Sequence, residues 1–332
     1  MATWGGMPAP AVGAAYPDML ARATREAMAT NDAGIAGVGT SSSNGSSGSV
    51  MLGRSAWLGS QKHGTAVWSG DTDSSWPALR QQVRAGLNMA LSGIVYWTTD
   101  IGGYAGGGGG PKHMGFDHNI YSVEYLQLLT RWFQFGVMCP VFRSHGHRLP
   151  TLPAVSCDGS GSGGYNEVWH FAEPYRSAIT QTMRLREKLR PCIESLYKEA
   201  ADSGAPVIRP LFYEFPDDAA AGGVEDQFML GGTYLAAPVL HPNATNRSVY
   251  FPVLPTGEAW RPFFFAPRAN LANDRHSVDS SSTGTNTTRA GAERGGGHDR
   301  VANYKGGQTL TVATPIESFP LYKRVRTSSI QS

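Results

Sequence analysis

A repeated order of short apolar run, polar tip and helix between residues 50 and 204 constrains the fold of this chain more than any other feature. The apolar runs are VMLGRS (50–55), GTAVWSGD (64–71), GIVYWTTDIGG (93–103) and GVMCPVFRSHG (136–146). Apolar strands that alternate with helical segments are typical of βαβ units. The pattern therefore predicts an α/β fold with a parallel sheet.

Three helices are expected between and after these runs. The first should begin near Pro77, which suits a first-turn position, and end at Gly93. The second spans about 121–135, and the third runs from about 174 to 202 and precedes Gly204. Apolar residues recur on one face of the first and third helices: Leu79, Val83, Leu87 and Leu91, then Leu185, Leu189, Ile193 and Leu196.

The chain changes character after Gly204. The segments PVIRPLFYEF, FMLGGTYLAAPVL, RSVYFPV and QTLTVAT are short, rich in β-branched and aromatic residues, and separated by Pro, Gly and Asn. This composition predicts antiparallel strands of a β-sandwich. Two Ser/Gly/Thr-rich segments, 39–49 and about 268–300, contain almost no apolar residues and are expected to be flexible insertions.

Composition excludes several kinds of partner. The 332 residues carry a formal net charge of +2, which gives no basic footprint for nucleic acid. No run of eighteen apolar residues is present, so no membrane span is expected. Cys139, Cys157 and Cys192 are far apart and form no CxxC pair, so neither a zinc site nor a disulfide framework is expected.

Polar side chains gather at the ends of the predicted strands. Arg54, Asp71, Asp100, Arg143 and His145 each follow an apolar run. The carboxyl ends of parallel strands in a barrel enzyme converge on one face, where the catalytic groups lie. We therefore expect these side chains to form one site.

The stretch WSGD, Trp68 to Asp71, places an acid behind a Gly turn and close to an indole. Desolvation by an aromatic neighbour favours the protonated form of a carboxyl group, which can then donate a proton to a leaving oxygen. The indole also offers a flat apolar face to a sugar ring. Arg and carboxylate groups give directional hydrogen bonds to hydroxyls. This combination favours sugar recognition over phosphate or nucleotide recognition.

Each of these features has a simpler interpretation. Asp71 could lie in water on a surface loop, as we expect for Asp73. Asp100 could be a structural cap before IGG, and Arg143 with His145 could form a salt-bridged strand end.

Two further motifs are open to a misleading interpretation. His145-x-His147 suggests a metal pair, but no carboxylate or Cys spacing accompanies it. GGYAGGGGGP (102–111) lacks GK[ST] and a GxGxxG before a helix, so a mobile active-site loop is favoured over a phosphate loop.

The chain resembles glycoside hydrolase family 31, the α-glucosidases and α-xylosidases, over about residues 50–325 apart from the second insertion. The segments that carry the resemblance are GRSAWLGSQKHGTAVWSGD (53–71), LNMALSGIVYWTTDIGGY (87–104), RWFQFGVMCPVFRSHG (131–146), EVWHF (167–171), LREKLRPCIESLYKEA (185–200), APVIRPLFYEFPDD (205–218) and FMLGGTYLAAPVL (228–240). The long helix and the strands after it are most similar to the xylosidase-type branch.

The resemblance implies roles for the strand-tip residues. Asp71 matches the general acid/base of a retaining mechanism that needs no metal or cofactor. The residues that match the lining of the sugar subsite are Arg54, Trp68, Asp100, Arg143 and His145, and Tyr104 stands where the family usually has Phe. The implied fold is a (β/α)8 barrel followed by β-sandwich domains.

One departure from the family concerns the catalytic nucleophile. Retaining hydrolysis needs two carboxylates about 5–5.5 Å apart. The family places its nucleophile upstream of the Arg54 motif, at the end of an apolar strand. The acids upstream here, Asp18, Glu26 and Asp32, have no such strand before them. Asp18 resembles the stretch after that strand, and Glu26 lies in a segment typical of the following helix.

We therefore expect the C-terminal half of a (β/α)8 barrel followed by an antiparallel β-sandwich domain, with no nucleophile in this chain. The expected division is a remnant with a flexible segment (1–49), the half barrel (50–204) and the sandwich (205–326). The expected function is retaining hydrolysis of α-linked O-glycosides or oligosaccharides, incomplete in this chain. The alternative is a non-catalytic sugar-binding relic or a partial gene product.

Overall fold

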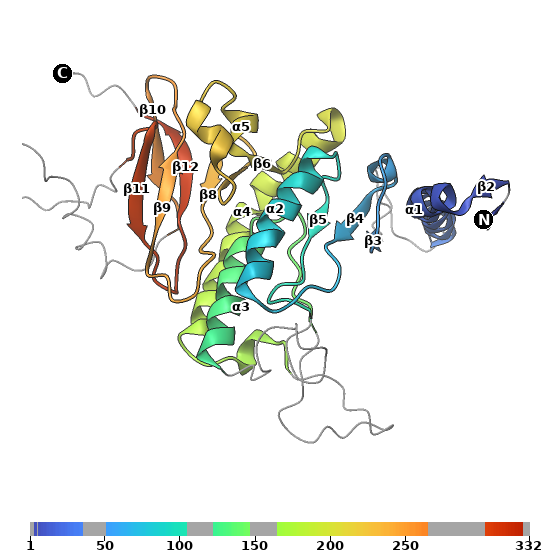
Figure 1. Ribbon diagram of the computed structural model, residues 1–332, viewed down its shortest axis with the longest axis horizontal. Coiled ribbons are helices and arrows are strands. Elements are labelled where there is room, and N and C mark those ends of the chain that lie inside the picture. Colours follow the sequence, from blue (N-terminus) through green and yellow to red (C-terminus); the bar gives the residue numbers. More distant parts are fainter. Residues whose placement is uncertain are drawn as a thin grey trace, which may run out of the picture.

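The computed structural model describes residues 3–4, 6–35, 51–104, 122–146, 165–264 and 303–327. Figure 1 shows a helix at one end of the molecule, the C-terminal strands at the other, and three helices with a parallel sheet between them. Both insertions predicted to be flexible, 39–49 and 268–300, lie outside the described residues.

The parallel sheet has three strands in the order β3, β4, β5. These are Met51–Gly53, Thr65–Trp68 and Trp97–Thr98, and all pairs are parallel. The fourth predicted run, 136–146, forms no strand of its own and joins the sheet only through a parallel bridge between Ile101 and Ser144. The reason is that the preceding helix continues to Gly136, so only the end of the run is extended. The 3-10 helix η1, Ser60–His63, connects β3 to β4.

The predicted helices form with the expected ends. Helix α2 is Trp76–Leu91, with Ser75 accepting a hydrogen bond from the Ala78 amide as N-cap, and Gly93 follows it with φ +80°. Helix α3, Val123–Gly136, is capped in the same way by Ser122. Helix α4, Tyr175–Ser203, follows the 3-10 helix η2, Val168–His170, and ends at Gly204 with φ +73°.

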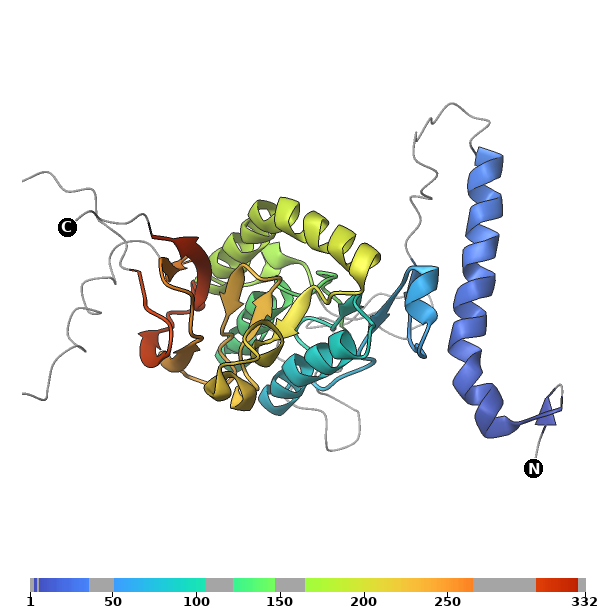
Figure 2. The same ribbon diagram turned by 90° about the horizontal axis from the view of Figure 1, so that it is seen from above.

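The N-terminal segment holds a long helix that the sequence pattern indicated only in part. Strands β1, Thr3–Trp4, and β2, Met7–Pro8, form a small antiparallel pair, and α1 spans Ala9–Ile35. Figure 2 shows α1 set beside η1 and apart from α2, α3 and α4. Asp18 of α1 lies 3.3 Å from His63 Nε2, which holds the helix against η1.

The C-terminal part is built from two antiparallel sheets, as the sequence predicted. A five-stranded sheet has the order β10, β12, β8, β7, β6, and β9 pairs with β11 in a second sheet. The strands are β6 Ile208–Pro210, β7 Phe228–Leu230, β8 Tyr234–Ala236, β9 Asn246–Phe251, β10 Glu258–Pro262, β11 Gln308–Ala313 and β12 Leu321–Arg326.

The strand expected over PVIRPLFYEF is shorter than predicted. It ends at Pro210, and the short helix α5, Leu211–Glu214, follows directly. Proline offers no N–H to continue the ladder, and Leu211 turns inward while Phe212 and Tyr213 remain exposed. The 3-10 helix η3, Ala219–Gly223, then leads to β7.

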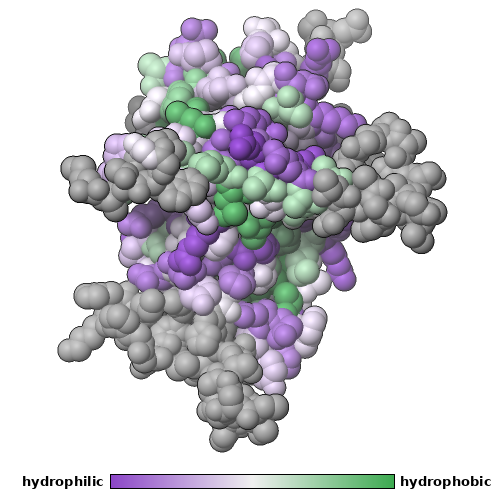
Figure 3. Space-filling model, turned by 90° about the vertical axis from the view of Figure 1, so that its right-hand side faces the viewer, coloured by the Kyte–Doolittle hydropathy of each residue, from purple (hydrophilic) through white to green (hydrophobic). Residues whose placement is uncertain are grey.

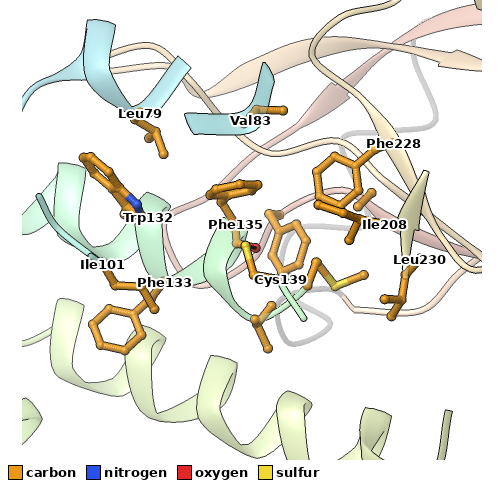
Figure 4. Packing of buried hydrophobic residues seen from close by; sticks show 14 of the residues in the cluster. Leu79, Val83, Ile101, Trp132, Phe133, Phe135, Cys139, Ile208, Phe228 and Leu230 are labelled. Carbon is orange, nitrogen blue, oxygen red and sulfur yellow. Dashed lines mark hydrogen bonds between the residues drawn. The ribbon is translucent and has the colours of Figure 1, made fainter. Parts of the chain in front are cut away.

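The five-stranded sheet separates two hydrophobic cores because side chains alternate along its strands. On β7, Phe228 and Leu230 face α2, α3 and α4, whereas Met229 faces the second sheet. Figure 4 shows the first core, in which Trp132 of α3 lies beside Leu79 and Phe135 of α3 lies near Val83 and Phe228. The second core includes Val249, Phe251, Trp260, Val312 and Tyr322, so the two sheets pack as a sandwich.

Arg131 of α3 joins the helices to the sandwich. This side chain is only 2% exposed, and it donates hydrogen bonds to the backbone carbonyls of Thr314, Pro315 and Ser318. Burial lowers its pKa to about 10. Gln134 beside it donates to the Ile316 carbonyl, so one turn of α3 holds the whole 314–318 segment. Within the described part of the chain, no helix is both long and apolar enough to cross a bilayer.

Candidate active site

The polar tips of the parallel strands meet at one edge of the sheet. In the register, Gly53 of β3 pairs with Val67 of β4, and Trp68 pairs with Thr98 of β5, so the three strands end at one level. Arg54 directly follows β3, and one residue, Thr99, separates Asp100 from the end of β5. The bridge of Ile101 to Ser144 brings the flanking Arg143 and His145 to the same edge.

Two arginine–carboxylate pairs form the centre of the site. Arg54 Nη2 lies 3.3 Å from Asp71 Oδ2, and Arg143 donates to Asp100 Oδ1. The two pairs differ in their exposure to solvent. The Asp71 side chain is 39% exposed, whereas that of Asp100 is fully buried. Asp71 is therefore open to a substrate group from outside, whereas Asp100 is held beneath the surface.

The electrostatics of Asp100 connect the two pairs. Its pKa is raised, first because burial disfavours the carboxylate. Arg143 and His145 act in the opposite direction, and the negative charge of Asp71 adds to the increase. The carboxyl group of Asp100 therefore interacts electrostatically with Asp71, which follows β4, and with Arg143 and His145 of the 136–146 segment.

The aromatic residues lie against the basic side chains. The Trp68 ring centroid is 5.8 Å from Arg143 Cζ, a cation–π distance. Tyr104 stacks on His145 with ring centroids 5.6 Å apart and an interplanar angle of 26°. The indole predicted to lie beside Asp71 is thus placed against the guanidinium that binds Asp100. With these contacts, the structure brings all seven predicted site residues into one linked cluster.

The loop that presents Tyr104 is positioned by residues that the sequence did not single out. The Tyr104 amide donates to the Thr72 carbonyl at 2.8 Å. Gly103 has φ +80°, and a Cβ atom there would lie 2.5 Å from Ser74 Cα. Only glycine fits this close approach. The IGG triplet was the available signal, although it does not identify Thr72 or Ser74 as the surface on which the loop rests.

Several buried polar atoms at this edge have no hydrogen-bond partner among the described residues. They are Asp100 Oδ2, Arg143 Nε, Ser69 Oγ, Thr72 Oγ1, Ser74 Oγ and Thr99 Oγ1. Buried polar groups in native proteins are usually paired, and an unpaired group costs free energy. A ligand rich in hydroxyl groups would supply donors and acceptors for such atoms.

Other candidate groups lie away from this cluster or outside the described residues. Asp18 contacts Lys62 and His63, and Glu26 pairs with Arg22 along α1. Asp32 lies near the end of α1. His147 and most of the glycine-rich run 102–111 fall outside the described residues. In the part of the chain that is described, no three His, Cys, Asp or Glu side chains form a metal-binding group.

The family models match almost the whole chain. The one for the "Glycosyl hydrolases family 31 TIM-barrel domain" matches residues 7–196, and the one for the "Glycosyl hydrolase family 31 C-terminal domain" matches residues 204–328. The first match begins at β2 and includes α1, so this helix lies within the part of the chain that matches the barrel domain. Together with the parallel strands and the antiparallel sheets that follow, these matches agree with the resemblance carried by the motifs.

Relatives in sequence and structure are longer than this chain. An α-xylosidase of Saccharolobus solfataricus is 36% identical over 215 residues, which is 65% of this chain and 25% of that protein. Alpha-glucosidase 2 of Bacillus thermoamyloliquefaciens is 35% identical over 205 residues, covering 61% of this chain and 22% of the relative.

A family 31 α-xylosidase from a soil metagenome, solved with xylose, superposes with a TM-score of 0.68 at 36% identity. The superposition covers 93% of this chain and 37% of the enzyme. The chain therefore spans about a quarter of the curated relatives and carries part of the barrel. It belongs to glycosyl hydrolase family 31.

Proposed function

We propose that this chain forms the acid/base side of an α-glycosidase site of the α-xylosidase or α-glucosidase type. The observation that carries the proposal is the cluster at the strand tips. In it, the partly exposed Asp71 stands beside Arg54, and the buried Asp100 is paired with Arg143. The substrate class follows from the relatives, which are named as α-xylosidases and α-glucosidases.

Asp71 is the proposed general acid/base. Its exposure allows the protonated carboxyl group to reach the leaving oxygen of a bound glycoside, and the carboxylate to accept a proton from water in the second step. Arg54, at 3.3 Å, stabilises the carboxylate that is left after proton donation. In both steps Asp71 acts by changing its protonation state, and a second carboxylate must form and release the glycosyl-enzyme intermediate.

The other cluster residues are proposed to hold the sugar. Asp100 is buried and holds Arg143, whose side chain is 22% exposed and can donate a hydrogen bond to a sugar hydroxyl. The face of Trp68 and the stacked Tyr104–His145 pair provide apolar walls for the carbon-bound hydrogens of a pyranose ring.

The second carboxylate of a retaining mechanism has no candidate in this cluster. Asp100 is fully buried and bound by Arg143, and the acids of α1 for which the structure gives contacts, Asp18 and Glu26, interact with other groups. We therefore propose that complete turnover requires a carboxylate from outside the cluster, in a barrel completed by further strands.

The test is hydrolysis of aryl α-xylosides and aryl α-glucosides by the chain alone and by the chain fused to the preceding barrel strands of a family relative. The fusion should turn over one of these substrates, and Asp71→Asn should abolish this activity whereas Asp73→Asn should not. Sugar binding without turnover in a well-folded fusion would favour the non-catalytic sugar-binding alternative. Turnover by the chain alone would contradict the need for an outside carboxylate.

A further inference from the structure

Three aromatic rings form an exposed surface beside the site, on the segment that carries η2. Tyr165 and His170 stack with centroids 3.7 Å apart and an interplanar angle of 11°. The Trp169 ring lies 6.2 Å from the His170 ring. Trp169 is 70% exposed and Tyr165 is 43% exposed. Single exposed aromatic residues are common on protein surfaces, and here two exposed rings flank the partly exposed His170. We call this group the η2 platform.

The platform is rigidly mounted on the hydrophobic core. Phe171 is buried and Val168 packs against the same core cluster, so the first residue of η2 and the residue after its end are both anchored to the core. The His170 and Phe171 amides donate to the Glu167 and Val168 carbonyls. This anchoring leaves Trp169 directed to solvent, and a binding surface of this kind loses little conformational entropy when a ligand arrives.

The platform is also continuous with the proposed active site. Asn166, next to Tyr165, donates from Nδ2 to the Gly146 carbonyl at 2.6 Å. Gly146 directly follows His145, which stacks on Tyr104 in the cluster. A ligand that extends out of the cluster past His145 would therefore meet the platform next.

The charge of the segment selects the class of ligand. Residues 165–173, YNEVWHFAE, contain two acids, Glu167 and Glu173, and no Lys or Arg. Nucleic-acid surfaces combine stacking rings with cationic groups that bind phosphate, and this segment has none. A neutral oligosaccharide fits both features, since the apolar faces of its rings stack on aromatic side chains and its hydroxyls bond to Asn, Glu and His.

We propose that the η2 platform is an outer subsite that binds the sugar units of an oligosaccharide beyond the residue held in the cluster. The identity of the ligand rests on the proposed function, but its binding does not require hydrolysis. The chain would then prefer extended oligosaccharides to monosaccharides. Loss of one stacking ring should weaken the binding of long ligands roughly three- to tenfold and leave monosaccharide binding unchanged.

The test is calorimetric titration of the full chain with glucose, xylose, maltohexaose and a xyloglucan heptasaccharide. Trp169→Ala is the test variant, and its side chain is exposed enough for the fold to tolerate the change. Trp57→Ala is the matched control, because Trp57 is 53% exposed and lies on the loop between β3 and η1. His170→Ala removes the stacked partner of Tyr165 and serves as a second test variant.

The expected result is weaker binding of one of the long ligands by both platform variants, with the Trp57 variant equal to the wild type. The proposal is overturned if the wild type binds neither long ligand more tightly than the monosaccharides, or if the platform variants match the control. Failure of the proposed catalytic function would give a different result. In that case the completed barrel would show no turnover, while the difference between Trp169→Ala and Trp57→Ala in oligosaccharide binding would persist.

Discussion

Replacing Arg131 by methionine should weaken the attachment of the sandwich to the helices. The guanidinium donates to the carbonyls of Thr314 at 2.5 Å, Ser318 at 2.8 Å and Pro315 at 3.2 Å. Methionine has a similar length, but its side chain is apolar and carries no hydrogen-bond donor. The variant thus leaves buried carbonyls of the 314–318 segment without a partner and changes little of the packing volume.

The magnitude follows from two opposing contributions. Three buried acceptors lose their partner, namely the carbonyls of Thr314 and Ser318 and Oε1 of Gln134, whereas the Pro315 carbonyl keeps the Ser318 amide. At about 2 kcal/mol for each acceptor, the loss costs about 6 kcal/mol. Removing the buried charge offsets part of this free-energy cost, because burial lowers the pKa of Arg131 from 12.5 to about 10. A difference of that size corresponds to about 3 kcal/mol in favour of the neutral form. The net loss in the free energy of unfolding should therefore be about 3 kcal/mol.

Urea unfolding followed by far-ultraviolet circular dichroism measures this loss. The matched control is Arg190→Met, because Arg190 is exposed on α4 and forms an ion pair with Glu187, which is also exposed. An exposed pair of this kind contributes about 0.5 kcal/mol. The loss in the free energy of unfolding for Arg131→Lys should fall between those for Arg131→Met and Arg190→Met, because lysine keeps the charge but cannot reach several carbonyls at once. If Arg131→Met unfolded at the same urea concentration as the control, the attachment described for this residue would be wrong.

Three further changes have defined outcomes. Gly103→Ala should lower the free energy of unfolding by about 3 kcal/mol, because its Cβ would meet the Ser74 backbone. Gly64→Ala has a similar φ, +73°, with open space around it, and should cost about 1 kcal/mol; equal losses in thermal melts would refute the contact. Burial raises the pKa of Asp100, so its contribution to stability is fully present below its ordinary value of 3.8 and is lost as the pH rises through the raised folded value. Asp100→Asn should therefore flatten the pH dependence of stability above pH 4, and an unchanged slope would contradict this. Figure 3 shows hydrophobic patches on the α1 side of the molecule, where Leu52 is 40% exposed on the edge strand β3. Leu52→Lys should reduce self-association in light scattering, whereas Leu91→Lys, at an exposed position on α2, should not.

The sequence predicted the helices and the proximity of the strand-tip residues more accurately than the extents of the strands. Gly93 and Gly204 marked helix ends because both take positive φ there, and Pro77 marked a beginning. The strand-tip residues were identifiable because they follow apolar runs, and parallel strands bring such ends together.

What the pattern missed has a physical cause in each case. Strand β12, LYKRVR, is paired on both sides by β10 and β8, but its three basic residues are not typical of a central strand. Helix α1 contains Pro17 and few regularly spaced apolar residues, so its sequence shows no clear helical period. The partners of Arg131 lie more than 180 residues away in sequence, so no local pattern reveals them. For the same reason, the sequence predicts that the strand-tip residues lie near one another, but it does not predict which of them are in contact. The contacts of Arg54 with Asp71 and of Trp68 with Arg143 are examples.

The role of Asp71 is tested most directly by chemical rescue in a completed barrel. We expect Asp71→Ala to slow hydrolysis of α-glycosides with poor leaving groups far more than hydrolysis of α-glycosyl fluorides, which need little protonation. Added azide should restore turnover and yield an α-glycosyl azide, because a small anion needs no general base in the second step. Full activity of Asp71→Ala on poor leaving groups, or no rescue by azide, would contradict the assignment of Asp71 as the acid/base.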